Sequence, residues 1–181
     1  MSRELVAGDE LQIDSRRLLK VRVTAPVLPC AEGVCLDTSA FLLTRLGRVV
    51  DDRHFVFYGN TTSPDDAVKF REIRGGDNVL DIDLGALSPV VDGIQLTGTI
   101  YEADRAGRTL ADITESTVRI SDSTGQELAQ HTLRPVPPGG TQDGRTLAAI
   151  FRRDARWVFR ATDDAFSFGL RGIASGLGVQ L

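Results

Sequence analysis

Side chains that carry oxygen stand at the ends of several apolar segments of this sequence, and the most unusual of them is Asp37. It lies within Leu36–Leu43, a segment whose other residues are mostly apolar and typical of a buried strand. Calcium and similar hard cations take several oxygen ligands from carboxylates, amides and backbone carbonyls. The sequence therefore offers a candidate calcium site at strand ends, and its candidate ligands are Asp37, Asn60, Asp65, Asp66, Asp77, Asn78, Glu102 and Asp104.

The same residue types also have an ordinary structural role. Asn60 and the Asp77–Asn78 pair stand next to glycines, which mark turns. Asp and Asn side chains at turns commonly hydrogen-bond to their own backbone. Such turns also expose carbonyl groups that could converge on a cation. Spacing alone favours the turn role and leaves the calcium role open.

The two cysteines and two histidines form no recognisable catalytic or metal motif. Cys30 and Cys35 are spaced at the outer edge of zinc patterns, and no closely spaced histidine pair accompanies them. Neither His54 nor His131 lies in a catalytic motif. Two ordinary buried thiols are therefore favoured over a zinc site or a structural disulfide.

Paired carboxylates are a further signal of enzymes. Asp81 and Asp83 alternate in an expected strand, which places them on one face about 6–7 Å apart. That spacing is within the range of glycosidase acids, but alternating acids on a strand usually form a solvated face. Ser39 lacks the glycines of a nucleophile elbow, and no glycine-rich phosphate-binding loop occurs. We therefore predict no catalytic residues, no cofactor-binding residues and no enzyme activity.

Length and composition are those of one globular domain spanning residues 1–181. Hydrophobic residues make up 41% of the chain, which is enough for a core without disulfide or metal cross-links. The net charge of −4 argues against a nucleic-acid-binding protein, which usually carries a basic surface. The sequence has neither a secretory signal pattern nor an apolar run of about 18 residues. We expect a cytoplasmic protein with reduced thiols and no membrane-spanning segment.

Alternating apolar and polar residues predict about eight to ten short strands. Clear examples are Leu18–Pro26, His54–Asn60 and the segment 93–104, while turn residues predict hairpins at Ser123–Gly125 and Arg153–Ala155. The regular spacing of turns and the scarcity of helical patterns predict an all-β, mostly antiparallel, two-sheet sandwich. A short C-terminal helix is expected to begin at Asp163–Asp164 and to carry Phe166, Leu170, Ile173 and Leu177 on one face.

The segment Leu36–Pro64, LDTSAFLLTRLGRVVDDRHFVFYGNTTSP, strongly resembles the TerD family of bacterial tellurium-resistance and stress-response proteins. Further matches are the GDN before an alternating strand, TIYEAD with Glu102 at a family glutamate, and the ending from Trp157 to GLGVQL. The resemblance implies a cytoplasmic β-sandwich that binds calcium through acidic strand-end loops. It also implies action through protein partners, in a membrane-associated stress complex, without a catalytic reaction.

This sequence departs from the family pattern where the metal chemistry lies. Gly33 and Cys35 stand where the resemblance implies acids, and the loop after Pro64 is shortened and carries Lys69, Arg71 and Arg74. Fewer carboxylates and added cations both weaken calcium binding. We therefore expect one reduced site in which calcium is bound weakly or lost; its ligands would be Asp37, Asn60, Asp77, Asn78 and Glu102. The alternative is a metal-free protein-interaction module of the same fold, and the sequence does not indicate its oligomeric state.

Overall fold

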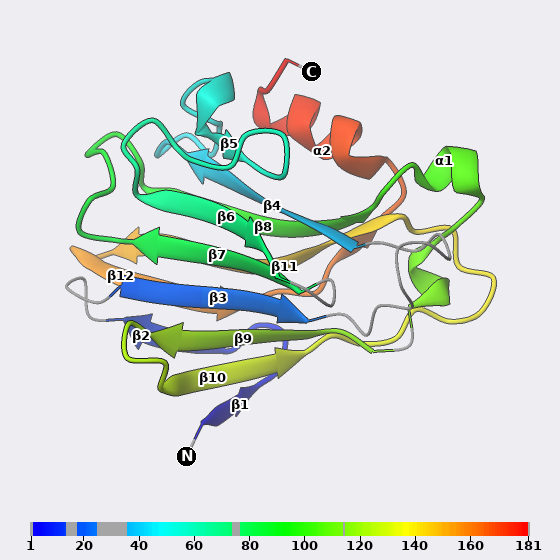
Figure 1. Cartoon of the computed structure of the whole chain (residues 1–181), viewed down its shortest axis with the longest axis horizontal. Helices are drawn as coiled ribbons and strands as arrows, with labels where there is room; N and C mark the ends of the chain where they lie inside the picture. Colours follow the sequence, from blue (N-terminus) through cyan, green and yellow to red (C-terminus); the bar gives the residue numbers. More distant parts are fainter. Residues whose placement is uncertain (1, 14–17, 25–35, 74–76, 114, 181) are drawn as a thin grey trace.

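Two β-sheets pack face to face in the computed structural model, which describes residues 2–13, 18–24, 36–73, 77–113 and 115–180 (Figure 1). Sheet A has the order β1 (Arg3–Leu5), β10 (Glu127–Thr132), β9 (Thr117–Asp122), β3 (Leu18–Thr24), β7 (Asn78–Asp83) and β6 (Val68–Glu72). Sheet B has the order β2 (Glu10–Ile13), β12 (Arg156–Ala161), β11 (Gly144–Arg153), β8 (Gly93–Ile100), β4 (Leu36–Leu43) and β5 (Phe55–Val56), and β13 (Ala165–Phe166) pairs with β11. All strand pairs in these described ranges are antiparallel except β1 with β10, so the predicted fold class is confirmed.

Strand β4 is buried on both faces, which explains its nearly continuous apolar sequence. Leu36, Ala40 and Leu42 belong to the core between the sheets. Phe41 points to the opposite face, where it belongs to a second, smaller cluster with Phe55. Because successive side chains alternate between faces, Asp37 shares the outer face of sheet B with Phe41.

Helix α2 (Gly169–Leu177) covers part of that outer face. Its residues Leu170, Ile173, Ala174 and Leu177 pack into the cluster that contains Phe41. The predicted helix is therefore confirmed, but its predicted start is wrong. Asp163 precedes β13, and its buried carboxylate forms ion pairs with Arg145 and Arg134. Asp163 therefore lies where its carboxylate can pair with the buried guanidinium of Arg145, and the helix begins six residues later, at Gly169.

Both predicted hairpins are present. The expected strand His54–Asn60 is wrong in most of its length, because only Phe55 and Val56 form a strand. Asp154 and Ala155, both with positive φ, join β11 to β12, and Gly125 lies in the turn between β9 and β10. His54 instead ends the 3-10 turn η2 (Asp52–His54), and β5 contains only two residues. The following residues, 57–60, form a tight turn closed by reciprocal backbone hydrogen bonds between Phe57 and Asn60.

One end of the sandwich gathers the beginning of β4, the end of β6, the beginning of β7 and the end of β8. The register requires this, since Leu36 pairs with Ile100 and Glu72 pairs with Asn78. The short helix α1 (Ala103–Ala106) and the 3-10 turn η3 (Leu110–Asp112) follow β8 at this end (Figure 1). We call it the Asp37 end, and it holds the main candidate site.

Candidate cation site at the Asp37 end

Asp37 is a partly buried carboxylate without a nearby positive charge among the described residues. Its backbone pairs with Thr99 of β8. Burial raises the pKa of this carboxyl group to about 6, and the negative charge of Glu72 contributes in the same direction. No hydrogen-bond donor in the described part of the chain contacts the carboxylate. The ionised form of Asp37 is therefore poorly stabilised by this protein alone, and a bound cation would stabilise it.

Asn78 contacts Leu36, the residue before Asp37, and thereby links the two sheets. It is buried, and its Nδ2 donates a hydrogen bond of 3.0 Å to the backbone oxygen of Leu36. The neighbouring Asp77 is partly buried, and its backbone oxygen accepts a 2.8 Å hydrogen bond from the amide of Ile73. The structure thus brings Asp77 and Asn78 to the Asp37 end, although the amide nitrogen of Asn78 already has a structural role.

Two tyrosines form the exposed rim of this site. Tyr58 and Tyr101 make an edge-to-face contact with ring centroids 6.2 Å apart. The pKa of the Tyr58 hydroxyl is raised, mainly by burial and then by the charges of Asp37, Tyr101 and Glu102. The charge of Glu102 thus acts on Tyr58, and Glu102 itself lies 3.4 Å from the guanidinium of Arg105.

Glu72, Tyr58 and Tyr101 were not among the residues predicted for this site. A usable signal was present for the tyrosines, because Tyr101 directly precedes Glu102 and Tyr58 stands two residues before Asn60. No local signal marked Glu72. Its proximity to Asp37 depends on the arrangement of β6, a strand of sheet A, relative to β4 of sheet B.

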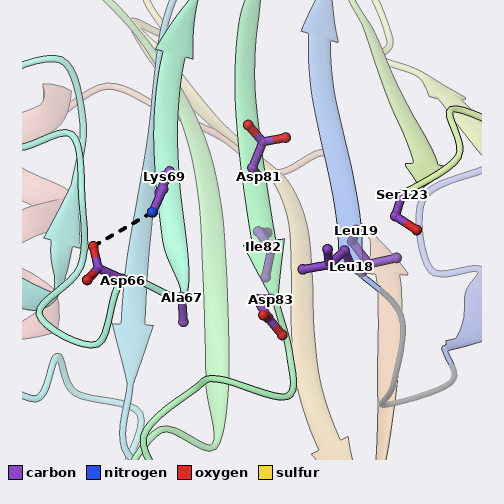
Figure 2. A pocket seen from close by; sticks show the side chains of 9 residues that line it. All are labelled: Leu18, Leu19, Asp66, Ala67, Lys69, Asp81, Ile82, Asp83 and Ser123. Carbon is purple, nitrogen blue, oxygen red and sulfur yellow. Dashed lines mark ion pairs between the residues drawn. The ribbon is translucent and has the colours of Figure 1, made fainter.

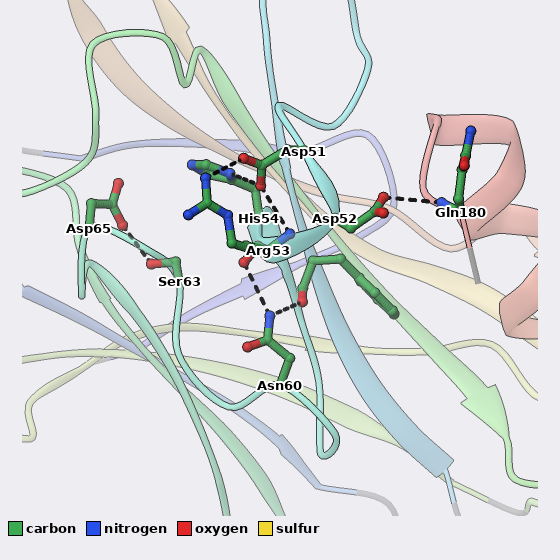
Figure 3. Close-up of polar contacts among 9 residues, drawn as sticks. Asp51, Asp52, Arg53, His54, Asn60, Ser63, Asp65 and Gln180 are labelled. Carbon is green, nitrogen blue, oxygen red and sulfur yellow. Dashed lines mark hydrogen bonds and ion pairs between the residues drawn. The ribbon is translucent and has the colours of Figure 1, made fainter.

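Asn60 has the structural role that its turn sequence favoured. Its Nδ2 donates hydrogen bonds to the backbone oxygens of Arg53 and Phe55, at 3.1 and 2.7 Å (Figure 3). These bonds hold the turn that carries Tyr58. Nearby, Asp51 contacts His54 and Arg53, both at 2.8 Å, and hydrogen bonds from Arg53 and His54 hold the pKa of Asp51 well below its usual range.

The remaining candidate ligands lie apart from Asp37 or are engaged elsewhere. Asp65 accepts a hydrogen bond from the Ser63 hydroxyl (Figure 3) and another from the Ser88 amide. Together with Asp66 it precedes β6, at the opposite end of the sandwich. Asp104 is exposed on α1. Within the described residues, no three His, Cys, Asp or Glu side chains lie close enough to hold one metal ion. The oxygen ligands at the Asp37 end are therefore few.

The basic residues of β6 do not approach Asp37. Lys69 lies 3.7 Å from Asp66, and Arg71 forms a 2.6 Å ion pair with Asp81. The electrostatic neighbour that β6 supplies to Asp37 is Glu72, which is negative. Gly33, Cys35, Cys30 and Arg74 lie outside the described residues.

The candidates for catalysis have structural partners. Besides the pairing of Asp81 with Arg71, the Asp83 carboxylate accepts hydrogen bonds from the amides of Gly85 and Ala86. Buried His131 contacts the backbone oxygens of Leu5 and Thr162 at 3.1 and 3.2 Å. His54 contacts Asp51, as described above. Each of these side chains thus has a structural contact that accounts for its position in the fold.

Comparison with known proteins identifies the family. The model of the TerD domain matches residues 1–176. The chain belongs to the TerD family. It is 30% identical over 152 residues to a tellurium resistance protein TerD of Serratia marcescens, covering 80% of this chain and 78% of that protein. It is 24% identical over 157 residues to general stress protein 16U of Bacillus subtilis, covering 81% and 78% of the two chains.

The TerD fold is also supported by solved structures. A Streptomyces coelicolor homologue of the telluride resistance protein TerD has a TM-score of 0.68 at 19% identity, covering 87% of this chain and 95% of that one. A protein of unknown function has a TM-score of 0.69 at 19% identity, covering 93% and 100%. The family resemblance and the sandwich predicted from the sequence are thus confirmed. Among the described residues, no helix is long and apolar enough to cross a membrane.

Proposed function

We propose that this TerD-family chain is a non-enzymatic stress-response protein of the tellurium-resistance type that binds calcium weakly at the Asp37 end. The proposal rests on the electrostatic proximity of two acids, Asp37 and Glu72. Asp37 is partly buried, its pKa is raised, and the described residues give it no positive partner. Calcium would supply the missing charge.

Asp37 and Glu72 would provide the carboxylate ligands, with Asp77, Asn78 and Glu102 beside them. Asn60 would act indirectly, by holding the turn that carries Tyr58. Calcium needs about six to eight oxygen ligands, and affinity falls as charged ligands are lost. The small number of acids at this end therefore supports weak binding, with a dissociation constant of roughly 10⁻⁴–10⁻³ M, in the range of low-affinity calcium modules.

Action through protein partners, in the cytoplasm and in a membrane-associated stress complex, is the second part of the proposal. The names of the relatives support the biological setting, since they refer to tellurium resistance and to general stress. The absence of enzyme activity is supported by the structural partners of Asp81, Asp83, His54 and His131.

Isothermal titration with calcium tests the binding. With a dissociation constant of about 1 mM, 10 mM calcium would also stabilise the fold by about 1.4 kcal/mol. We expect binding heat and this stabilisation for the wild type, and neither for Asp37→Asn. Asp104→Asn, which removes an exposed acid at the same end, is the matched control and should bind like the wild type. Absence of heat and of stabilisation in the wild type would contradict the proposal.

The metal-free interaction module is the second candidate function. It is favoured by the lack of three clustered ligands among the described residues and by the structural use of Asn60 and Asn78. Affinity capture from stressed cells, with and without a calcium chelator, separates the two candidates. Partners that are recovered only without chelator support the calcium-dependent protein, whereas equal recovery supports the module.

A further inference from the structure

Two tyrosines with half-exposed rings meet at the Asp37 end. Tyr58 lies in the tight turn after β5, and Tyr101 directly follows β8. Tyr58 is 50% exposed and Tyr101 is 49% exposed. Their rings are inclined by 75° to each other, with centroids 6.2 Å apart. We call these two residues the tyrosine pair; together they offer aromatic surface to a ligand from two directions.

The ring of Tyr58 is anchored to the core through a series of aromatic contacts. Buried Phe41 and Phe55 stack with their ring centroids 4.5 Å apart. Phe57 stacks on Phe55 at 4.4 Å and contacts the edge of Tyr58 at 5.1 Å. The hydrogen bonds of Asn60 hold the turn itself (Figure 3). Tyr58 is therefore presented on a fixed support, so that binding a ligand would require little additional ordering.

Negative charge without a cation partner surrounds the tyrosine pair. Asp37 and Glu72 are electrostatic neighbours, and the described part of the chain gives neither carboxylate a cation partner. The charges of Asp37 and Glu102 both act on the Tyr58 hydroxyl. Glu102 lies 3.4 Å from Arg105, but the side chain of Arg105 is 83% exposed, and water screens such a pair. A cation at the tyrosine pair would therefore be attracted by these acids.

The hollow on sheet A shows the opposite situation (Figure 2). Of its acids, Asp66 lies 3.7 Å from Lys69, and Asp81 forms a 2.6 Å ion pair with Arg71. The protein thus supplies its own cations there. At the Asp37 end, acids without such partners coincide with exposed aromatic rings, and this combination suits a cation that comes from another molecule.

A guanidinium group matches this combination better than an ammonium group. Cations bind over the faces of tyrosine rings, and arginine does so more often than lysine. The guanidinium is planar, so it can stack on a ring, and its N–H donors form a fork that fits a carboxylate. It is also more weakly hydrated than an ammonium group. Weak hydration favours binding here, because the Asp37 carboxylate is partly buried.

We propose that an arginine side chain of a protein partner binds at the tyrosine pair and pairs with the Asp37 carboxylate. The inference rests on the action through protein partners proposed above and names the group by which a partner is recognised. The guanidinium would stack on a tyrosine ring and direct its N–H groups toward Asp37, while Glu72 adds attraction at longer range. Because the arginine and calcium would both use the Asp37 carboxylate, each should exclude the other.

An NMR titration with a blocked Gly-Arg-Gly peptide, in the presence of a chelator, tests the arginine site. The backbone amide signals of Asp37, Tyr58 and Tyr101 should shift and saturate as the peptide is added. The matched control peptide carries citrulline, which has the shape of arginine without its charge, and should bind roughly tenfold more weakly. No shift at these three residues, or equal binding of the citrulline peptide, would overturn the proposal.

Substitutions of Tyr101 separate the aromatic contact from the carboxylate contact. Tyr101→Leu should weaken binding of the arginine peptide roughly tenfold, whereas Tyr101→Phe should bind it like the wild type, because a cation–π contact needs the ring and not the hydroxyl. Tyr58→Leu serves if Tyr101→Leu fails to fold. A leucine variant that binds the peptide like the wild type, or a phenylalanine variant that loses as much as the leucine variant, would refute the role of the rings.

Calcium titration of the same variants separates this inference from the proposed calcium binding. Tyr101→Leu should bind calcium like the wild type, whereas Asp37→Asn should lose both calcium and the arginine peptide. A wild type that binds the peptide but not calcium would contradict the calcium proposal and leave the arginine site supported. A wild type that binds calcium but not the peptide, or one in which saturating calcium leaves the peptide bound, would contradict the arginine site alone.

Discussion

Replacing Asp37 with asparagine should stabilise the calcium-free protein at neutral pH. The folded carboxyl group has a pKa of about 6 against an ordinary value of 3.8, because burial and Glu72 disfavour its charge. A difference of about two pKa units corresponds to roughly 3 kcal/mol of destabilisation when Asp37 is ionised. An asparagine at this position keeps the shape of the side chain and carries no charge, so the variant should avoid most of this cost.

The sign of the pH dependence follows from the raised pKa. Between about pH 3.8 and 6 the folded chain holds a proton on Asp37 that the unfolded chain releases, so the contribution of this group to stability falls as pH rises through that window. Below the unfolded pKa the contribution is constant. The advantage of Asp37→Asn should therefore be absent near pH 3.5 and complete above about pH 7.

Urea unfolding in the presence of a chelator, repeated across this pH range, measures the effect. At pH 7.5 the variant should gain about 1–3 kcal/mol, or several degrees in melting temperature for a chain of this size. Asp104→Asn, an exposed acid at the same end, should give no comparable gain. A variant that is less stable than the wild type at pH 7.5, or a difference that does not change with pH, would refute this explanation.

Three further substitutions test the packing that positions the site, each by urea unfolding. Phe41→Ala should cost about 3–5 kcal/mol, since Phe41 is fully buried and stacks on Phe55; a cost below about 1 kcal/mol would be inconsistent with that packing. Asp163→Asn should cost about 3–5 kcal/mol by leaving buried Arg145 without its partner, and unchanged stability would contradict the pairing. Ala155→Gly should stabilise by about 1 kcal/mol, because Ala155 has φ 61; a loss would argue against that turn geometry.

Much of the fold could be predicted from the sequence because its signals are local. Alternation of apolar and polar residues marks β3, and turn residues mark both hairpins. The failures occurred where a tertiary contact overrides the local pattern. Asp163 resembles a helix start, but its carboxylate is buried beside Arg145. The aromatic residues after His54 resemble a longer strand, but the side chain of Asn60 holds them in a turn.

The candidate site was only partly predictable for the same reason. Asp37 and Asn78 could be selected by residue type and by their position at strand ends, and they lie at the same end of the sandwich. Glu72 could not be selected, because it approaches Asp37 from the other sheet and carries no motif. Whether Asn60 stabilises a turn or serves as a ligand could not be predicted either, because its hydrogen bonds to Arg53 and Phe55 are visible only in the structure.

Calcium-soaked crystals test most directly whether the Asp37 end still binds calcium. The anomalous difference map should show one calcium peak with Asp37 and Glu72 oxygens at about 2.3–2.6 Å. Crystals of Asp37→Asn, soaked in the same way, should lack the peak. A well-ordered Asp37 with no calcium within coordination distance, in wild-type crystals at millimolar calcium, would contradict the account and favour the metal-free interaction module.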